Sequence, residues 1–525
     1  MHSIVQLFNW KFIKIETFIP QLAEIGISHI HVSPPTLSID SEHWWGRYQP
    51  LHYFIIAGPL GYKEDFKSMC NQATKYNISI MIDAVINHMA EPVGNFNQLV
   101  YGSKSLLLKH PLWLHFSDQY LALPPERNVV LREEHFFSQK EQFNISNYED
   151  HEQLIYGNLG GLPDLDLYHQ DVQSIQKEYL KFLVENGVTS IRIDAVKHIQ
   201  PTYVSMITET FLELVKYQPQ ALILSEIICG SYNYDERLKP YVDTVLNDTN
   251  WKHVKFYNFP LLENFKNMCN NKISIDKFLE NYTDGIPVFH AVQFGCNHDI
   301  PYNNAFEYLE LNSNEAFQAD ILMTLAGHGI PYYFVDDDKS INLQNFEDNY
   351  STKNDFYSID TFKDRKLKEL LTLYQDCSTL RPMKTLWSND HNFWIGYRVH
   401  QRSEMIDNTL MIIFNNSKYN YDIHSCWPAI SVFNNIPNGS YLDYFNGEYQ
   451  INIKNGRLLE QLTLPPKTIV VLKINNISDK DNMKSMLYQS KRILNKTSSE
   501  VNSILQTMNN NLTHEINNIC KIISI

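Results

Sequence analysis

Short apolar runs rich in β-branched residues alternate with longer amphipathic stretches up to about residue 380. Each run is apolar on both faces, which is typical of strands buried in a parallel sheet. The intervening stretches, such as Tyr62–Tyr76 and Val172–Asn186, predict helices. This alternation predicts an α/β fold whose strands close into a (β/α)8 TIM barrel. The predicted strands are Ile4–Phe8, Ile27–Ser33, Ile78–Val85, Val188–Ala195, Ala221–Ile227, Val242–Asn247, Val288–Phe294 and Ile330–Val335.

The barrel is expected to occupy residues 1–89 and 166–385, interrupted by an excursion domain, residues 90–165, after the third strand. An insertion of this length is too long for a simple loop. Residues 386–475 contain short strands separated in part by Asn-Gly pairs, as at Asn438-Gly439 and Asn446-Gly447. This pattern predicts a C-terminal antiparallel β-sandwich domain.

Residues 476–525 form a polar tail rich in Asn and Lys, in which apolar residues recur every three or four positions. This spacing predicts one amphipathic helix. The simplest interpretation is that the helix docks onto the body of the protein. The alternative is a coiled coil or partner-binding helix through which the tail mediates self-association.

Composition excludes several classes of partner. The net charge of −15 argues against nucleic acid, because binding phosphates requires a basic surface. No stretch approaches 18 apolar residues, so no membrane span is expected. The seven cysteines are scattered without a Cys-x-x-Cys pair, which favours reduced, buried thiols. No leader sequence is recognisable before the first strand, so a cytoplasmic protein is expected.

Candidate chemistry lies where predicted strands end in acids. Asp83, Asp194, Glu226 and Asp299 each follow an apolar run. The active site of a parallel barrel lies at the carboxyl ends of its strands. Because strand side chains alternate, Arg192 and Asp194 share the face that points into the barrel mouth. Several carboxylates in one pocket suggest hydrolysis of a sugar bond, which requires a nucleophile and a proton donor.

The segments Asp83-Ala-Val-Ile-Asn-His88, Leu162-Pro-Asp-Leu-Asp166, Arg192-Ile-Asp-Ala-Val-Lys-His198, Glu226 and Asn297-His-Asp299 resemble, in order and spacing, the motifs of the α-amylase family of glycoside hydrolases. Trp44-Trp-Gly-Arg-Tyr-Gln-Pro50 and Val32-Ser-Pro-Pro35 resemble its chloride-type members from animals and bacteria. The resemblance covers residue 1 to about residue 475.

The resemblance implies that Asp194 is the nucleophile, that Glu226 is the general acid and base, and that Asp299 orients the sugar. The residues themselves add that the cation of Arg192 lowers the pKa of Asp194, whereas Glu226 needs a raised pKa. The alternative for Asp194 is a buried salt bridge with Arg192 alone.

Further substrate contacts are implied by the resemblance. His88 and His298 match positions that bind sugar hydroxyls, and Tyr48 matches a stacking platform. Trp44 is expected to pack the barrel rim. The remaining implied contacts are Arg192, Trp45 and Gln49, with Lys197 and His198 on the leaving-group side.

The family implies a calcium site with side-chain ligands from Asn87 and Asp164 and the carbonyl of His198. Such oxygen donors suit Ca²⁺. In chloride-type members an Arg after the eighth strand holds the anion, but residues 332–338 here are Tyr-Tyr-Phe-Val-Asp-Asp-Asp, which argues against chloride. The loop after the Asn-His-Asp motif also departs from the family and reads Ile300-Pro-Tyr-Asn-Asn304.

The sequence therefore predicts a retaining endo-hydrolase of α-1,4-glucosidic bonds in starch- or glycogen-type glucans. One alternative is a related α-glucan transglycosylase or maltodextrin hydrolase. The other is a catalytically silent sugar-binding homologue, which the presence of all three acids disfavours.

Overall fold

The fold was analysed in a computed structural model. It describes residues 1–41, 43–92, 100–137, 143–230, 234–246, 251–280, 286–327, 329–336, 366–377, 383–389, 392–398, 409–427, 438–454 and 457–475. The predicted helical tail, residues 476–525, and an apolar run of the predicted C-terminal domain, residues 430–433, lie outside these ranges. The chain forms two compact units, Met1–Ser378 and Thr379–Ile525.

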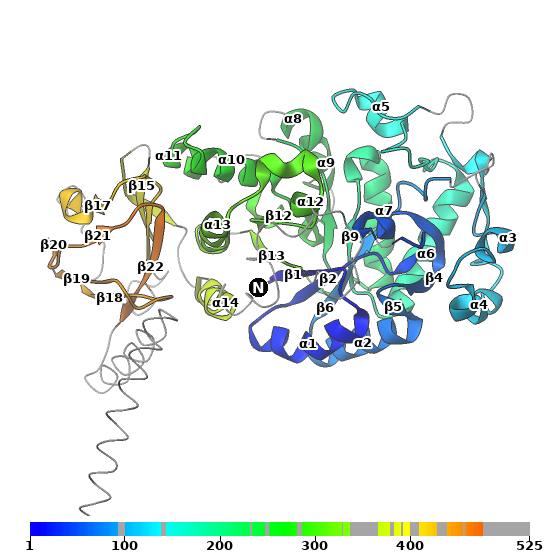
Figure 1. The fold of residues 1–525 in the computed structure, drawn as a ribbon, viewed down its shortest axis with the longest axis horizontal. Helices are drawn as coiled ribbons and strands as arrows, with labels where there is room; N and C mark the ends of the chain where they lie inside the picture. Colours follow the sequence, from blue (N-terminus) through cyan, green and yellow to red (C-terminus); the bar gives the residue numbers. More distant parts are fainter. Residues whose placement is uncertain are drawn as a thin grey trace, which may run out of the picture. The chain divides into compact units, whose positions relative to one another are not determined.

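The first unit is built on a closed barrel of eight parallel strands, as the sequence predicts (Figure 1). Around the barrel the strands follow the order β1-β13-β12-β11-β10-β9-β6-β2. Their bounds are β1 (Ile4–Phe8), β2 (His29–Val32), β6 (Ser79–Ala84), β9 (Ser190–Ile193), β10 (Ile223–Ser225), β11 (Val254–Tyr257), β12 (Ala291–Phe294) and β13 (Ile330–Asp336).

One predicted strand is wrong. Residues 242–247 were expected to form the sixth strand, but Lys239–Leu246 forms helix α9, and the strand in that place is β11. Short apolar runs do not by themselves distinguish a strand from a buried helix segment. β11 was hidden because its sequence, Val-Lys-Phe-Tyr, contains a lysine.

Helices surround the barrel (Figure 1). In α6, apolar residues at helical spacing, including Val172, Tyr179 and Leu183, are buried. Gly187 then turns the chain toward β9 with a φ of +97°, a conformation that favours glycine, and an added Cβ would lie 2.6 Å from Cys70 Cβ. The main helices are α1 (Phe12–Glu24), α2 (Lys63–Lys75), α6 (Gln170–Glu185), α7 (Pro201–Leu214), α9 (Lys239–Leu246), α10 (Phe259–Cys269), α13 (Ser313–Leu325) and α14 (Leu367–Asp376).

Two additions to the barrel shape its mouth. One follows β2 and contains β3 (Thr36–Ser38), the 3-10 helix η1 (Trp44–Tyr48), β4 (Pro50–Gly58) and β5 (Gly61–Tyr62). The other is the excursion segment, which contains β7 (Val100–Tyr101), α3 (Lys104–Leu107), α4 (Trp113–Leu121), β8 (Leu131–Arg132), η2 (Glu133–His135) and α5 (His151–Tyr156). The two share a small core formed by Leu37, Ile55, Ala57, Leu107, Phe116 and Tyr120.

The second unit contains a seven-stranded sheet in the order β14-β15-β16-β22-β18-β19-β20, with a two-stranded sheet, β17-β21. All its strand pairs are antiparallel, as predicted. The bounds are β14 (Lys384–Ser388), β15 (Phe393–Arg398), β16 (Leu410–Asn415), β17 (Tyr421–Asp422), β18 (Gly439–Asp443), β19 (Gln450–Lys454), β20 (Arg457–Leu458), β21 (Thr463–Leu464) and β22 (Thr468–Asn475). Across the described residues, no helix has the length and apolar character needed to cross a bilayer.

Candidate active site

Four charged residues meet where three neighbouring strands end. Asp83 lies in β6 and pairs in register with Arg192 of β9. Asp194 directly follows β9, and Glu226 directly follows β10. Since parallel strands end at the same edge of a barrel, these side chains are delivered to one place.

Arg192 binds all three acids. Its Nη1 donates hydrogen bonds to Asp83 Oδ1 and, at 2.6 Å, to Asp194 Oδ1. Its Nη2 donates to Glu226 Oε1. Arg192 is only 1% exposed, and a buried guanidinium is tolerated only with such charged partners. The salt bridge between Arg192 and Asp194 therefore exists, but it is part of a larger cluster.

A sharp bend after β9 brings backbone N–H groups to Glu226. Ala195 adopts a left-handed conformation with φ 52° and ψ 36°. Its backbone N–H donates to Glu226 Oε2 at 3.1 Å, and the N–H of Val196 donates to the carbonyl of Glu226 at 3.0 Å. A left-handed alanine is strained, and this strain is located beside the reacting groups.

Asp299 reaches the same place from β12, as the first residue of the short helix α12 (Asp299–Tyr302). Asn297 Nδ2 donates to Asp299 Oδ2 at 3.1 Å, and His298 Nε2 lies 3.6 Å from Asp299 Oδ1. Tyr48 then joins the two sides of the barrel, because its hydroxyl lies 2.8 Å from both Asp83 Oδ2 and His298 Nε2. The four acids thus belong to one hydrogen-bonded cluster.

Burial opposes the ionisation of two acids in the cluster. Burial raises the pKa of Asp194 to about 8 against the opposing effect of Arg192, and nearby Glu226 and Asp83 contribute to the rise. Burial and Glu226 also raise the pKa of Asp299 well above its usual value. Although burial acts against it, Arg192 holds the pKa of Asp83 below its usual range. The sequence predicts that Arg192 lowers the pKa of Asp194. Arg192 does act in that direction, but the effect of burial is larger, so the net shift is upward.

The imidazoles of the site are neutral at neutral pH. Burial lowers the pKa of His88 to about 4 and that of His298 well below its usual value. His88 Nε2 lies 3.0 Å from the carbonyl of Tyr48, which leaves Nδ1 buried with no hydrogen-bond partner. A neutral ring of this kind offers one donor and one acceptor. The Nδ1 atom of His88 is therefore an acceptor that no protein group uses.

The acids open onto a cavity of about 520 Å³. Among the residues expected to bind substrate or metal, those lining it are Trp45, Tyr48, His88, Asp194, Lys197, His198, Glu226, His298 and Asp299. Arg192 lies below the cavity floor and is not part of its lining. Lys197 Nζ lies 5.4 Å from the ring centre of Tyr148, and burial lowers its pKa.

Other lining residues were not foreseen from the sequence. Trp44 was expected only to pack the rim, but it lines the cavity and contacts the ring of His298. Tyr148 comes from the excursion segment, where only its aromatic character signals a role in the site. The rest of this group is Leu159, Leu162, Ala195, Ile228, Asn303, Ala305 and Phe306.

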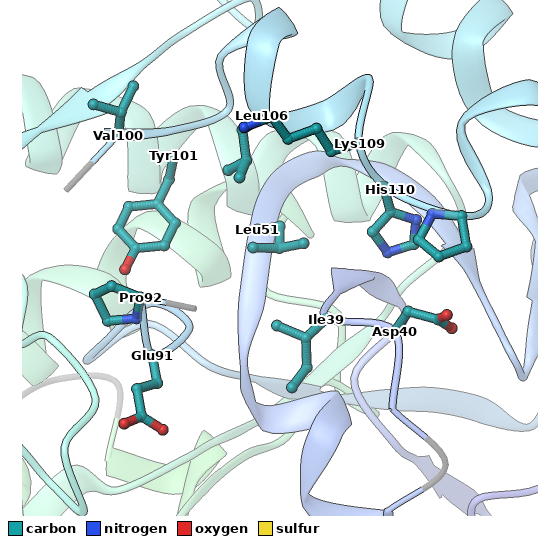
Figure 2. A pocket seen from close by; sticks show the side chains of 11 residues that line it. Ile39, Asp40, Leu51, Glu91, Pro92, Val100, Tyr101, Leu106, Lys109 and His110 are labelled. Carbon is teal, nitrogen blue, oxygen red and sulfur yellow. The ribbon is translucent and has the colours of Figure 1, made fainter. Parts of the chain in front are cut away.

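Gln49 lies behind the cavity wall and does not line it. It is 8% exposed, and its Oε1 accepts the backbone N–H of Glu91 at 3.0 Å. On the far side is a second cavity of about 350 Å³, with Tyr101 and Glu91 on one side and Ile39 and Asp40 on the other (Figure 2). This second cavity contains none of the four clustered acids, so chemistry is expected only in the first.

The residues expected to bind calcium leave buried oxygens without partners. Asn87 Nδ2 donates to Asp164 Oδ1 at 2.5 Å, but Asn87 Oδ1 and Asp164 Oδ2 are buried and accept no hydrogen bond. Burial raises the pKa of Asp164 well above its usual value. Nδ1 of His198 lies 2.9 Å from the carbonyl of Leu154, and the main-chain carbonyl of His198 is the oxygen donor that this residue would contribute. Oxygen acceptors left unsatisfied in this way fit a hard cation.

A second group suits a metal less well. In the described chain, His135, His169 and Asp171 place their ligand atoms within 4.8 Å of one another. However, Nδ1 of His135 accepts the N–H of Arg132, and Nδ1 of His169 accepts that of Asp171. A neutral ring that accepts at Nδ1 carries its proton on Nε2, so neither Nε2 has a lone pair for a metal.

Comparison with known families identifies this arrangement. The family model described as "Alpha amylase, catalytic domain" matches residues 15–360. The chain belongs to the α-amylase family. It is therefore a glycoside hydrolase, and its first unit contains the closed barrel that the sequence predicts.

Its relatives include an α-amylase of Aeromonas hydrophila, 28% identical over 346 residues, which are 63% of this chain and 71% of the relative. The pancreatic α-amylase of Rattus norvegicus is 32% identical over 204 residues, but the match spans only 38% of this chain and 37% of the relative. The shorter match limits what can be transferred from the rat enzyme.

Solved structures share the fold. α-Amylase I of Eisenia fetida, in a variant bound to maltohexaose, has a TM-score of 0.65 at 18% identity and covers 90% of this chain and 97% of its own. A γ-cyclodextrin glucanotransferase from an alkalophilic Bacillus clarkii has a TM-score of 0.61 at 18% identity, covering 89% of this chain and 65% of its own. At these identities the likeness concerns the fold of this family member and leaves its reaction specificity open.

Proposed function

We propose that this chain hydrolyses α-1,4-glucosidic bonds within starch- or glycogen-type glucans with retention of configuration. The observation that supports this most directly is that one guanidinium, that of Arg192, bridges Asp194 and Glu226, while Asp299 lines the same cavity. Retaining hydrolysis requires two carboxyl groups about 5 Å apart. Asp194 and Glu226 contact the two terminal nitrogens of the Arg192 guanidinium, so their carboxyl groups lie close enough together to meet this requirement.

In the proposed reaction, an Asp194 oxygen attacks the anomeric carbon while Glu226 protonates the departing glycosidic oxygen. The bond between the anomeric carbon and that oxygen breaks, and a glycosyl ester forms on Asp194. Glu226 then removes a proton from water, which attacks the ester and releases the sugar and the free carboxylate. Asp299 and the neutral ring of His88 hold hydroxyls of the sugar at the bond being cleaved, and His298, whose Nε2 lies 2.8 Å from the Tyr48 hydroxyl, positions Tyr48 beside them.

Asp194 has to lose its proton before it attacks. Burial raises its pKa, whereas the hydrogen bond from Arg192 Nη1 stabilises the ionised form. The proton that Asp194 gives up can remain within the acid cluster, because Asp299 also has a raised pKa and hydrogen-bonds to Glu226. The cluster can therefore hold an ionised Asp194 while Asp299 retains a proton.

Calcium is proposed as a structural ion. Asn87 Oδ1, Asp164 Oδ2 and the carbonyl of His198 are the groups that would hold it. When bound, the ion supplies positive charge that offsets the buried Asp164 carboxylate and ties the excursion segment to the barrel. His198 lines the cavity, so this tie also fixes one wall of the site.

Chloride is not expected to act on this enzyme. Arg192 already contacts three acids, so an added anion beside it would meet a surplus of negative charge. Tyr332 in β13 is uncharged. Its hydroxyl lies 2.9 Å from the Tyr257 hydroxyl and 3.0 Å from His31 Nδ1. We expect glucan cleavage to be unchanged between chloride and acetate salts of equal ionic strength. A clear activation by chloride would contradict this.

The deciding experiment compares the wild type with Asp194→Asn on a maltooligosaccharide labelled at its reducing end. Cleavage should fall by on the order of 10⁴-fold or more. The first product of the wild type, observed by NMR, should be the α-anomer. Asp171→Asn is the matched control, since this acid lies outside the cavity with a side chain 71% exposed. Unchanged cleavage by Asp194→Asn, or a β-anomeric first product, would refute the mechanism.

Glycosyl transfer is the second candidate. The aromatic rings of Tyr148 and Phe306 line the cavity and give an acceptor sugar apolar surfaces on which to pack. If the acceptor outcompetes water, the same experiment will yield oligosaccharides longer than the substrate. If hydrolysis dominates, only shorter products will form.

A further inference from the structure

A group of aromatic side chains is exposed on the excursion segment, apart from those that line the cavity. Tyr156, at the end of α5, is 39% exposed, and Tyr168 is 52% exposed. The partly buried ring of Phe137 lies between them, with ring centres 5.2 Å from Tyr156 and 6.2 Å from Tyr168. We call Phe137, Tyr156 and Tyr168 the aromatic platform.

The platform is held in a fixed geometry. Phe137 meets Tyr156 at an interplanar angle of 87° and Tyr168 at 64°, which are favourable edge-to-face contacts. The N–H of Phe137 also donates to the carbonyl of Asp164 at 3.1 Å. Rigid tyrosine rings bind a ligand with little loss of side-chain entropy. The two exposed rings are therefore prepared for contact before any ligand arrives.

Polar groups lie beside the exposed rings. Asp166 is partly exposed, and its Oδ1 accepts the N–H of Tyr168 at 2.9 Å. Its charge is close enough to Tyr168 to contribute to the raised pKa of that phenol, after burial and Tyr156. A sugar ring has an apolar C–H face and a rim of hydroxyls, so it suits aromatic faces bordered by a carboxylate. A purely apolar partner would leave Asp166 desolvated and unpaired.

The platform is continuous with the wall of the catalytic cavity. Leu159 and Leu162 line that cavity, and both lie between Tyr156 and Tyr168 in the sequence. Leu159 is three positions after Tyr156, so their Cα atoms lie no more than about 11 Å apart. α5 also packs on the 3-10 helix η3 (Val196–His198), which contributes to the cavity. A chain bound in the cavity can therefore extend toward the platform.

We propose that the aromatic platform, with Asp166, is a second binding site for an α-1,4-glucan chain outside the catalytic cavity. This inference rests on the proposed function for the identity of the ligand. Its role is to hold a further stretch of a long substrate, so that it increases affinity for polymers without touching the bond being cleaved. Short oligosaccharides that fill only the catalytic cavity do not use it.

The test compares the full-length wild type with the double variant Tyr156→Ala/Tyr168→Ala on soluble starch and on maltotetraose. KM for starch should rise roughly fivefold, the effect of losing aromatic contacts of this strength, with kcat unchanged. kcat/KM for maltotetraose should stay the same. An unchanged KM for starch, or an equal loss on both substrates, would overturn the proposal.

Two further variants separate ring stacking from disturbance of the fold. Tyr156→Phe/Tyr168→Phe keeps both ring faces and should retain most of the affinity for starch. Tyr76→Ala removes a similarly exposed ring, 42% exposed, just after α2 and before the start of β6, far from the carboxyl ends of the strands. It should behave as wild type. A loss in Tyr76→Ala equal to that of the double alanine variant would contradict a specific site.

Binding can also be measured without catalysis. Asp194→Asn should be retarded in a gel that contains glycogen, and the added Tyr156→Ala/Tyr168→Ala substitutions should abolish most of the retardation. If no glucan is cleaved but this tyrosine-dependent retardation persists, the proposed reaction fails and the platform stands. If glucans are cleaved but retardation is independent of both tyrosines, the platform fails and the reaction stands.

Discussion

The barrel and the second unit differ in what they bury: the barrel encloses a cluster of charged side chains, whereas the core of the second unit is apolar. The barrel buries Arg192 against Asp83, Asp194 and Glu226, with His31 beside them. The sheet packs a core cluster of apolar residues, among them Phe393, Ile395, Tyr397, Met411, Ile413, Tyr441, Ile451, Val470 and Leu472. Buried charge is costly, whereas buried apolar surface stabilises folding. The barrel thus retains an arrangement that is unfavourable for stability alone.

The largest effect should come from removing the charge at the centre of the barrel. Arg192→Met leaves three buried acids without their cation, so cleavage should fall by at least about 10³-fold and unfolding free energy by roughly 3–5 kcal/mol. Activity assays and chemical denaturation measure the two losses. Arg192→Lys keeps the charge but cannot reproduce the bridge between Asp194 and Glu226, so it should recover stability better than activity. Full activity in Arg192→Met would break the comparison.

The next largest effects should come from truncating one buried apolar side chain in each unit. Ile413→Ala, at a fully buried position in the sheet, should cost about 2–5 kcal/mol of unfolding free energy with kcat per folded molecule unchanged. The same change at Ile191, next to Arg192 in β9, should lower stability and also kcat, because small displacements at a catalytic group reduce the rate. Denaturation and active-site-normalised assays give both values. Equal kcat losses at the two sites would contradict the distinction.

Calcium removal should have an intermediate effect, confined to the first unit. A chelator should lower the thermal midpoint of the wild type, since a ligand at 100 times its Kd stabilises by about 2.7 kcal/mol. Asp164→Ala should lack this response, and Asp171→Asn, at an exposed acid, should retain it. Calorimetry with and without calcium provides the measurement. A chelator response that persists in Asp164→Ala would place the ion elsewhere.

The last prediction concerns the direction in which pH changes stability. The pKa of Asp194 rises from 3.8 to about 8 on folding. Between these values the folded chain binds more protons than the unfolded chain, so this residue's contribution to stability is complete below the lower value and is lost as the pH rises through the higher. Asp194→Asn removes that dependence, so the stability of the variant relative to wild type should increase from pH 4 to pH 8. A relative decrease would reverse the sign of the pKa shift.

Most of the barrel was accessible from sequence because each strand is a short apolar run with a clear length. The failure at residues 242–247 occurred where an apolar run belongs to α9, while Lys255 interrupts the real strand, β11. Lys255 is tolerated there because its Nζ donates to the carbonyls of Lys252 and Phe289, a compensation that no local pattern reveals.

The candidate site could be predicted only in part from the sequence, for a related reason. Side-chain alternation along β9 is a local property, and it correctly directs Arg192 toward the acids. The position of Gln49 behind the cavity wall depends on a bond to Glu91, and Tyr148 reaches the cavity through the path of the excursion segment. Such contacts join residues far apart in sequence, so they follow from the completed fold and not from any single element.

The bridge made by Arg192 has a consequence for how the enzyme matures. Its partners sit on β6 and just beyond β9 and β10, so all three chain segments have to be in register before the guanidinium finds them. A slip of one residue would turn these side chains to the outside of the barrel. Competence for catalysis therefore depends on the register of three strands, and a barrel closed out of register would be silent as well as unstable.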